Sequence, residues 1–575
     1  MIAEARDGAQ TLLKCLEAEG IEYMFGYSGG AALPIFDALE TAGTKIKFVL
    51  ARHEQGATHM ADGYARATGK PACVLVTSGP GAGNTLTGIM TAHMDSVPMV
   101  VITGQQVTWM LGKDAFQEAD IFGITMPVVK HSYLVKDTND IPRITKEAMY
   151  IATTGRPGPV LIDMPKNISQ GACDAPLEVP MDLPGYHPEI SEAVDRDDVI
   201  AIADALNRST RPLILAGHGA MLAHAGPELL ALAETCRIPV TSTLLGKGIF
   251  PETHDLSLGM LGMHGTAYAN KAVCEADLIM SVGSRFDDRI IGQADKFGRN
   301  ARIIHIDIDP AEIGKMILPE LKAVGDAKVI LQELNKHVTR LQTDEWLAHL
   351  NGYKKRFPLS YKKQGGLKMQ HILDVLDRLT ESKAVITTDV GQHQMWAAQF
   401  CKTEKPWDWI TSGGAGTMGF GFPAAIGAQF GRPGEPVIAV VGDGGFQMTL
   451  FELSTAVIHK LPVKILVLNN HFLGMVRQWQ ELFFDNRKSG VDLEGNPDFV
   501  KLAEAYGAKG FQIKRPADIE KVLTRALEYN DGPCLINCEV VKEDNVFPMI
   551  PAGAALEDMI IEKPKYRMEK PVGST

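Results

Sequence analysis

Short apolar runs alternate along the chain with stretches in which apolar residues recur at helical spacing. In the clearest example, an apolar run over 437–441 ends at the turn 442–444. A helical pattern then continues to Pro462, and a second apolar run over 463–468 ends at Asn469-Asn470. Strand, helix and strand in succession form a βαβ unit, and near-continuous apolar strands are typical of parallel sheets covered on both faces. This stretch therefore predicts a parallel α/β sheet.

The same alternation recurs on both sides of this stretch and predicts an α/β protein built from three open, doubly wound parallel-sheet domains. Residues 1–185 form the first domain, 198–345 the second and 369–550 the third, and 551–575 form a charged C-terminal tail or lid. The expected strands outside the third domain lie at 48–50, 72–76, 98–103, 160–162, 212–216, 278–282 and 302–306.

Composition agrees with this plan and excludes other classes of protein. At 575 residues the chain is too long for one hydrophobic core. A net charge of −12 argues against nucleic-acid binding, and no apolar stretch is long enough to cross a membrane. The N-terminus carries acids throughout rather than a basic-then-apolar signal, and eight scattered cysteines are not a disulfide framework. We expect a cytoplasmic enzyme.

Two polar side chains stand where strands of the 437–470 unit end. Asp443 follows one strand and Asn470 the next, and chemistry in parallel sheets gathers at these carboxyl ends. Their oxygens suit Mg²⁺ that also binds diphosphate, and the neighbouring glycines allow close approach of a phosphate. Asp-Gly alone would be read as a β-turn. The spacing, with residues 445–468 between the two halves, resembles the diphosphate-binding signature of thiamine diphosphate enzymes.

A second candidate lies in the first domain, where Glu54 follows a strand and opens a helix. His53-Glu54 is followed by His59, which is not the HExxH spacing of zinc proteases, so we reject a metal site here. Alone, Glu54 would be an acid favoured in the first helical turn by the helix dipole. Beside a thiamine diphosphate domain it gains a role, because a carboxylate on the aminopyrimidine ring activates this cofactor.

Over nearly its whole length the chain resembles acetohydroxyacid (acetolactate) synthases, most closely the large catalytic subunit of the bacterial biosynthetic type. The segments that carry the resemblance are 25–30, 52–56, 77–81, 114–118, 155–159, 260–265, 285–289, 390–396, 416–421 and 474–479. In that family the cofactors are thiamine diphosphate, Mg²⁺ and FAD, and the cofactor lies between the first domain of one subunit and the third of its partner.

The resemblance assigns site residues position by position. The expected catalytic residues are Glu54, Gly30, Phe116, Gln117 and Arg289. Thiamine diphosphate contacts are expected from Glu54, Val390, Gln392, His393, Met418, Gly442, Gly444, Gly445 and Met475, and metal ligands from Asp443, Asn470 and Phe472. FAD contacts are expected from Arg156, Gly217, Gly219, Thr243, Leu244, Met263, His264, Gly283, Arg285, Asp307 and Asp326. Substrate contacts are expected from Met263, Arg289, Met475 and Trp479.

Several of these residues carry little signal by themselves. Gly217 and Gly219 follow a strand, but Leu222 stands where a dinucleotide fingerprint needs glycine, so the motif by itself favours a plain loop. Arg289 offers a planar fork to a carboxylate, or it pairs at the surface with neighbouring aspartates. Trp479 would wall an acceptor pocket, or it packs in the core.

The implied reaction is acetolactate synthesis: pyruvate is decarboxylated on thiamine diphosphate and its hydroxyethyl unit passes to a second 2-keto acid. Pyruvate as acceptor gives 2-acetolactate, and 2-ketobutyrate gives 2-aceto-2-hydroxybutyrate, both on the route to branched-chain amino acids. The resemblance further implies a homodimer or homotetramer and a separate small regulatory subunit. Val107 and Trp109 depart from the family pattern in the substrate channel, which leaves inhibitor sensitivity open.

The sequence leaves several alternative functions open. A pyruvate oxidase would also use thiamine diphosphate and FAD, although the segment 285–289 with Trp479 argues against it. A glyoxylate carboligase would lack the glutamate at position 54, and the catabolic acetolactate synthase would lack FAD. A non-catalytic scaffold would have lost Glu54, Asp443 or Asn470, and all three are present.

Overall fold

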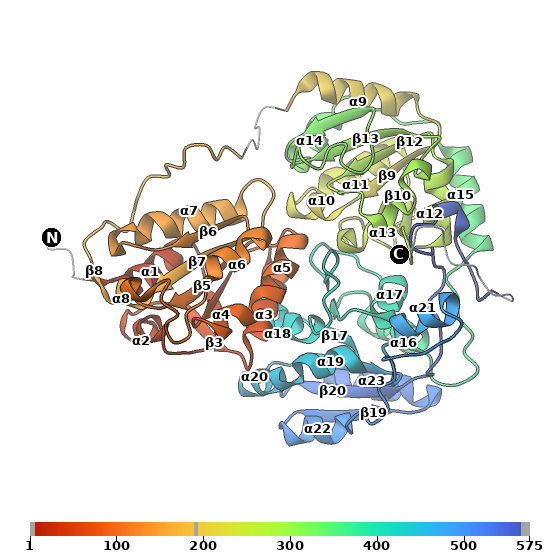
Figure 1. The fold of residues 1–575 in the computed structure, drawn as a ribbon. Helices are drawn as coiled ribbons and strands as arrows, with labels where there is room; N and C mark the ends of the chain where they lie inside the picture. The colour runs from red at the N-terminus through yellow and green to blue at the C-terminus, as the bar shows by residue number, and fades with distance from the viewer. Residues whose placement is uncertain (1–5, 189–193, 565–575) are drawn as a thin grey trace.

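The computed structural model describes residues 6–188 and 194–564. Three six-stranded sheets form three domains in chain order, and all pairings within these sheets are parallel (Figure 1). In each sheet the strand that comes first in the sequence lies in the interior, and strands that come later in the sequence flank it on both sides, as in the order β11-β10-β9-β12-β13-β14. The predicted doubly wound α/β fold is therefore confirmed.

The first domain has the strand order β3-β2-β4-β5-β7-β6. A short antiparallel pair, β1 (Arg6–Asp7) and β8 (Ala172–Cys173), joins its two ends. Its strands are β2 (Tyr23–Gly26), β3 (Lys47–Leu50), β4 (Ala72–Val76), β5 (Met99–Gln105), β6 (His131–Leu134) and β7 (Pro159–Pro165), and its helices are α1 (Gly8–Ala18), α2 (Leu33–Thr41), α3 (Glu54–Thr68), α4 (Pro80–Asn84), α5 (Leu86–Met94), α6 (Ile121–Thr125), α7 (Ile141–Thr153) and α8 (Lys166–Gln170).

The second domain begins with a helix at Arg196, and its sheet grows outward from β9. Its strands are β9 (Pro212–Ala216), β10 (Val240–Ser242), β11 (Ser257–Met260), β12 (Leu278–Val282), β13 (Arg302–Asp307) and β14 (Leu321–Val324), and its helices are α9 (Arg196–Arg208), α10 (His218–Leu222), α11 (Gly226–Cys236), α12 (Ala267–Glu275), α13 (Asp288–Ile291), α14 (Ala327–Leu334) and α15 (Asp344–Arg356).

The third domain contains the βαβ unit of the 437–470 stretch, with strand order β16-β15-β17-β18-β20-β19. The single helix expected there is wrong, because a 3₁₀ turn at Leu450–Glu452 divides it in two. Its strands are β15 (Val385–Thr388), β16 (Trp409–Thr411), β17 (Val437–Gly442), β18 (Lys464–Asn469), β19 (Lys509–Ile513) and β20 (Cys534–Glu539), and its helices are α16 (Met369–Thr380), α17 (Gln392–Phe400), α18 (Gly421–Gly431), α19 (Asp443–Thr449), α20 (Leu453–Ile458), α21 (Gly474–Phe483), α22 (Phe499–Ala505) and α23 (Ile519–Glu528).

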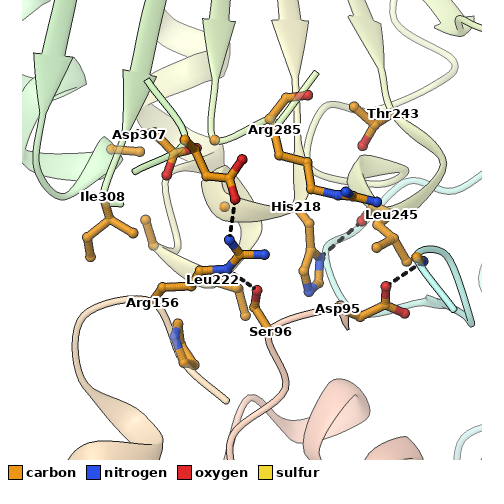
Figure 2. A pocket seen from close by; sticks show the side chains of 18 of the residues that line it. Asp95, Ser96, Arg156, His218, Leu222, Thr243, Leu245, Arg285, Asp307 and Ile308 are labelled. Carbon is orange, nitrogen blue, oxygen red and sulfur yellow. Dashed lines mark hydrogen bonds and ion pairs between the residues drawn. The ribbon is translucent and has the colours of Figure 1, made fainter. Parts of the chain in front are cut away.

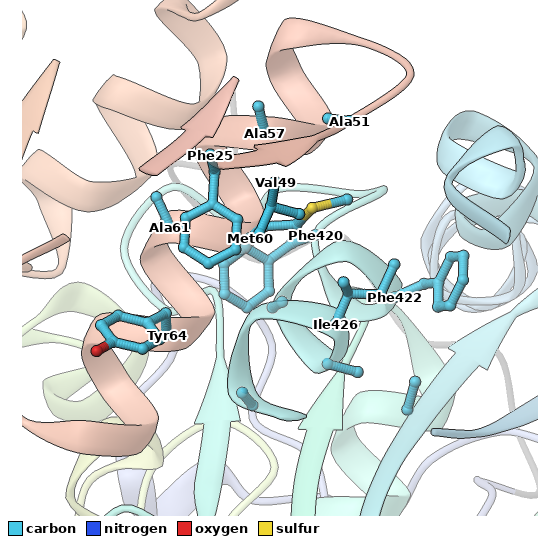
Figure 3. Packing of buried hydrophobic residues seen from close by; sticks show 14 of the residues in the cluster. Phe25, Val49, Ala51, Ala57, Met60, Ala61, Tyr64, Phe420, Phe422 and Ile426 are labelled. Carbon is cyan, nitrogen blue, oxygen red and sulfur yellow. The ribbon is translucent and has the colours of Figure 1, made fainter. Parts of the chain in front are cut away.

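The first and third domains share one hydrophobic core, in which α3 packs against α18. Figure 3 shows Met60 of α3 beside Phe420, the residue that precedes α18. Two glycines permit this contact: a Cβ on Gly427 would lie 1.8 Å from the carbonyl oxygen of Met60, and one on Gly63 would lie 2.1 Å from that of Ala424. The two domains are thus fixed against each other through helix backbones.

The C-terminal segment, as far as residue 564, lies against the second domain. Met549 and Ile560 form an antiparallel bridge, and Arg299 pairs with Glu557 at 2.9 Å. Residues 565–575 of the expected tail lie outside the described residues. Within 6–188 and 194–564, no helix has the length and apolar character needed to cross a bilayer.

Candidate functional site

A cavity of about 640 Å³ opens at the carboxyl ends of β17 and β18, and Asp443 and Asn470 both line it. Asp443 is the first residue of α19 and is buried, and this burial raises the pKa of its carboxyl to about 6. Asn470 is also buried, and its side-chain oxygen accepts a hydrogen bond from the backbone N–H of Phe472 at 3.1 Å. The oxygen donors expected from the sequence therefore meet in one cavity.

The donor set fits a metal that also binds diphosphate. No group of three or more His, Cys, Asp or Glu side chains gathers as a metal site anywhere in the described residues, so one carboxylate and one amide need oxygens from a ligand. His393 lines the same cavity, and its buried Nε2 has no hydrogen-bond partner in the described chain. A Cβ on Gly442 would lie only 2.8 Å from this ring, so the imidazole packs directly against the glycine backbone.

The same cavity is also lined by the residues expected to contact the substrate. Trp479 is half-buried on α21, and its ring lies 5.1 Å from that of Phe483. The side chain of Arg289 is 60% exposed, and its Nε lies 3.6 Å from Oδ2 of Asp288, a long and solvent-exposed ion pair. The predicted site residues that line this cavity are Leu244, Met263, His264, Arg289, Val390, Gln392, His393, Met418, Gly442, Asp443, Gly444, Gly445, Asn470, Phe472, Met475 and Trp479.

A second cavity lies where all three domains meet (Figure 2). Arg156 reaches into it from the first domain, donating to Ser96 Oγ at 2.9 Å and pairing with Glu312 at 2.7 Å. Asp307 closes β13, and burial raises the pKa of its carboxyl to about 6. The predicted FAD contacts that line this cavity are Arg156, Gly219, Thr243, Leu244, Gly283, Arg285, Asp307 and Asp326.

The donors of the second cavity fit a flavin dinucleotide. Arg156 and Arg285 line it as cations of the kind that bind phosphate oxygens, and Asp307 stands at a strand end, where a carboxylate can accept a ribose hydroxyl. The buried Nε2 of His218, which also lines this cavity, has no partner in the described chain. These groups are complementary to the phosphates and hydroxyls that FAD presents.

Three of the predicted FAD contacts lie elsewhere. Met263 and His264 line the first cavity, and Gly217 lines neither. A Cβ on Gly217 would lie 2.1 Å from the carbonyl oxygen of Gly283, so glycine is needed there for the packing of two strand-end loops. The two cavities are nevertheless neighbours, because Leu244 and Arg289 line both.

Glu54, Gly30, Phe116 and Gln117, the first-domain residues expected to act in catalysis, lie apart from both cavities. Glu54 is the first residue of α3 and is 9% exposed, and Asn84 donates to its Oε2 at 3.0 Å. Gln117 lies against the same glycine loop as Glu54: a Cβ on Gly79 would meet the carbonyl oxygen of Gln117 at 2.8 Å, and one on Gly81 would meet Glu54 Oε1 at 3.2 Å. Phe116 is 82% exposed. Neither Gly30, Glu54, Phe116 nor Gln117 lines the cavity of Asp443, so within one chain the predicted site is in two halves.

Comparison with known proteins finds three successive family domains along the chain. Models of the thiamine pyrophosphate enzymes match in three parts: the N-terminal TPP binding domain at 6–124, the central domain at 199–334 and the C-terminal TPP binding domain at 389–538. The acetolactate synthase large subunit of Haemophilus influenzae is 46% identical over 567 residues, covering 97% of this chain and 98% of its own. That of Corynebacterium glutamicum is 45% identical over 567 residues, covering 97% and 90%.

The chain belongs to the acetolactate synthase large subunits. The red alga Porphyra purpurea has another relative of that name, 46% identical over 578 residues, covering 98% of this chain and 97% of its own. Membership in this family of thiamine pyrophosphate enzymes confirms the resemblance drawn from the sequence segments.

The geometry adds residues to this acetolactate synthase site that the sequence did not single out. Asn496 donates to Oδ2 of Asp443 at 2.7 Å, and Asn84 holds Glu54. Asp389 follows β15 and accepts the backbone N–H groups of Gly419 and Gly421 at 3.0 and 3.2 Å, which fixes the loop that carries Met418. Only Asp389 had a sequence signal, as an acid at the end of an apolar strand. Asn84 and Asn496 follow no pattern.

Proposed function

We propose that this chain is the catalytic subunit of an acetolactate synthase that uses pyruvate as donor and pyruvate or 2-ketobutyrate as acceptor. One observation carries the proposal. Asp443 and Asn470, which suit a metal–diphosphate group, line the same cavity as Arg289 and Trp479, which suit a 2-keto acid. Cofactor and acceptor can therefore lie side by side in one enclosed space.

When bound, thiamine diphosphate supplies a carbon nucleophile and accepts the electrons released by decarboxylation. Asp443, Asn470 and the backbone of Phe472 would hold Mg²⁺ and, with it, the diphosphate. Gly442, Gly444, Gly445 and His393 would border the diphosphate, while Val390, Gln392, Met418 and Met475 would hold the rings. Glu54 would hold a proton shared with the aminopyrimidine ring.

The completed site would contain residues of two chains. Glu54 lies outside the cavity of Asp443, together with Gly30, Phe116 and Gln117. A second copy that places its first domain over this cavity would bring a carboxylate to the cofactor, so a homodimer is the smallest active unit, alone or within a homotetramer. A small regulatory subunit would be a separate chain.

Arg289 and Trp479 would govern the acceptor. The guanidinium of Arg289 is 60% exposed and lies 3.6 Å from Asp288, and it would offer two parallel N–H donors to the carboxylate of a keto acid. Trp479, with Met263 and Met475, would give an apolar wall that buries the extra methyl group of 2-ketobutyrate. FAD would occupy the neighbouring cavity, with Arg156 and Arg285 at its phosphates and Asp307 at a ribose.

Product analysis tests the proposal. Purified protein is incubated with thiamine diphosphate, Mg²⁺, FAD, pyruvate and 2-ketobutyrate. We expect 2-acetolactate and 2-aceto-2-hydroxybutyrate, with the latter in excess at equal substrate concentrations. Acetyl phosphate or hydrogen peroxide as the main product would instead identify a pyruvate oxidase. A protein that retains no flavin through purification would favour the catabolic, FAD-free enzyme.

A further inference from the structure

A buried carboxylate from the third domain holds the backbone just before Glu54. Glu452 is fully buried at the end of the 3₁₀ turn Leu450–Glu452. Its Oε1 accepts the backbone N–H groups of Arg52 and His53, each at 3.1 Å, and its Oε2 accepts from Arg52 at 3.0 Å. These two residues directly precede α3, whose first residue is Glu54.

The chain around Glu452 is arranged to keep this contact. The hydroxyl oxygen of Thr455 lies 3.0 Å from Glu452 Oε2 and 3.1 Å from the carbonyl oxygen of Leu50, so its one hydrogen is shared between these two acceptors. A Cβ on Gly56 would lie 2.1 Å from Glu452 Oε1, so glycine at this position makes room for the carboxylate. Burying a carboxyl group costs free energy unless hydrogen bonds satisfy it, and here backbone N–H groups do so.

Glu54 is thereby held from two sides. Glu452 fixes the backbone that leads into it, and Asn84 donates to its carboxylate at 3.0 Å. A carboxylate that must meet a ring nitrogen needs this precision, since a misplacement of about 1 Å can cost on the order of 100-fold in rate. Glu452 also lies on the segment that begins with Asp443, because α19 runs directly into the 3₁₀ turn.

We propose that Glu452 is a positioning residue for Glu54, tying the helix that carries it to the segment that begins at the metal ligand Asp443. The inference rests on the role proposed above for Glu54. It extends that site into the junction between the first and third domains of the same chain. The segment there begins at Asp443, the proposed metal ligand, and ends at Glu452, which anchors the backbone before Glu54.

Two substitutions of Glu452 distinguish the loss of its hydrogen bonds from the loss of its side-chain volume. Glu452→Leu fills much of the space but leaves the N–H groups of Arg52 and His53 without an acceptor. Glu452→Gln is the matched control, because its amide oxygen can take the place of Oε1 and its NH₂ can donate to Thr455. Gly56→Ala is a third variant that keeps Glu452 but displaces its carboxylate.

The first readout needs no cofactor. Hydrogen–deuterium exchange of the amides of Arg52 and His53, measured by mass spectrometry on the full-length protein, should accelerate at least about 10-fold in Glu452→Leu and Gly56→Ala. The second readout is the rate at which the C2 proton of bound thiamine diphosphate exchanges with D₂O. We expect it to fall about 10- to 100-fold in both variants, with cofactor affinity within about 3-fold of wild type.

Glu452→Gln should stay within about 3-fold of wild type in both readouts. A wild-type C2 exchange rate in both Glu452→Leu and Gly56→Ala would overturn the proposal, as would a parallel loss of cofactor affinity, which indicates a purely structural role. If Glu452→Leu does not fold, the proposal is tested by comparing the two readouts between Gly56→Ala and Glu452→Gln. Glu54→Gln is measured alongside: if it keeps normal C2 exchange, the role of Glu54 itself is wrong, whatever the Glu452 variants do.

Discussion

Asn496 donates a hydrogen bond from its side-chain nitrogen to Oδ2 of Asp443 at 2.7 Å. The two residues are 53 positions apart, and the contact fixes the carboxylate that opens α19.

Asn496→Ala should therefore weaken Mg²⁺ activation more than it changes turnover. Groups that orient a metal ligand typically contribute about 10- to 100-fold in affinity, so we expect a rise of about 10-fold in the Mg²⁺ concentration for half-activation. Steady-state rates over a Mg²⁺ titration give this value, with Asn351→Ala on the exposed side of α15 as the control. An unchanged half-activation point would show that the contact does not orient Asp443.

The sequence predicts a strand well only where both faces of that strand are buried. Strands buried on both faces were visible as apolar runs, so the expected strand at 72–76 is β4 as observed. Edge strands were less visible: in β14, Lys322 and Val324 are exposed and only Ala323 is buried, which produces no apolar run. The break of the helix after Asp443 was missed, because the apolar spacing through Leu450 remains helical.

The candidate site was visible where chemistry follows a strand end, as at Asp443 and Asn470. It was not visible where contacts join distant positions. Glu452 and Arg52 are 400 residues apart, and no local pattern connects them. At Gly217 the sequence pattern is misleading. This glycine matches part of a phosphate-binding turn, but in the structure it allows close packing against Gly283.

Trp479 should control the choice of acceptor. In Trp479→Leu the apolar wall recedes, so the contribution from burying the extra methyl group of 2-ketobutyrate shrinks, and one such group is worth about 10-fold or more in discrimination. We expect the ratio of 2-aceto-2-hydroxybutyrate to 2-acetolactate, measured in competition, to fall by about 10-fold. Phe483→Leu changes the ring that packs against Trp479 outside the cavity, and it should lower stability with little change in the ratio.

Asp163 should make stability depend on pH. It is buried between Thr103 and Gln105, and burial raises the pKa of its carboxyl from 3.8 to about 7. The folded chain thus keeps a proton that the unfolded chain has lost above pH 3.8, so stability falls as pH rises from that value to about 7 and is level above it.

Asp163→Asn removes this titration. Between about pH 5.5 and 8, wild type should lose about 2 kcal/mol of unfolding free energy relative to the variant. Chemical unfolding midpoints at the two pH values measure the difference, and the exposed Asp174→Asn serves as the control. Parallel pH dependence in wild type and Asp163→Asn would mean that the carboxyl titrates near its ordinary value.

The central claim is that Glu54 and Asp443 of one chain serve two different sites. Mixing a Glu54→Gln variant with an Asp443→Asn variant, under conditions that exchange subunits, tests it most directly. Hybrid dimers would then contain one intact site, formed by Glu54 of one chain and Asp443 of the other. Random mixing of two inactive variants should restore about a quarter of wild-type acetolactate formation. If the mixture stays as inactive as its parents although hybrids form, both residues act within one chain and the proposed site is wrong.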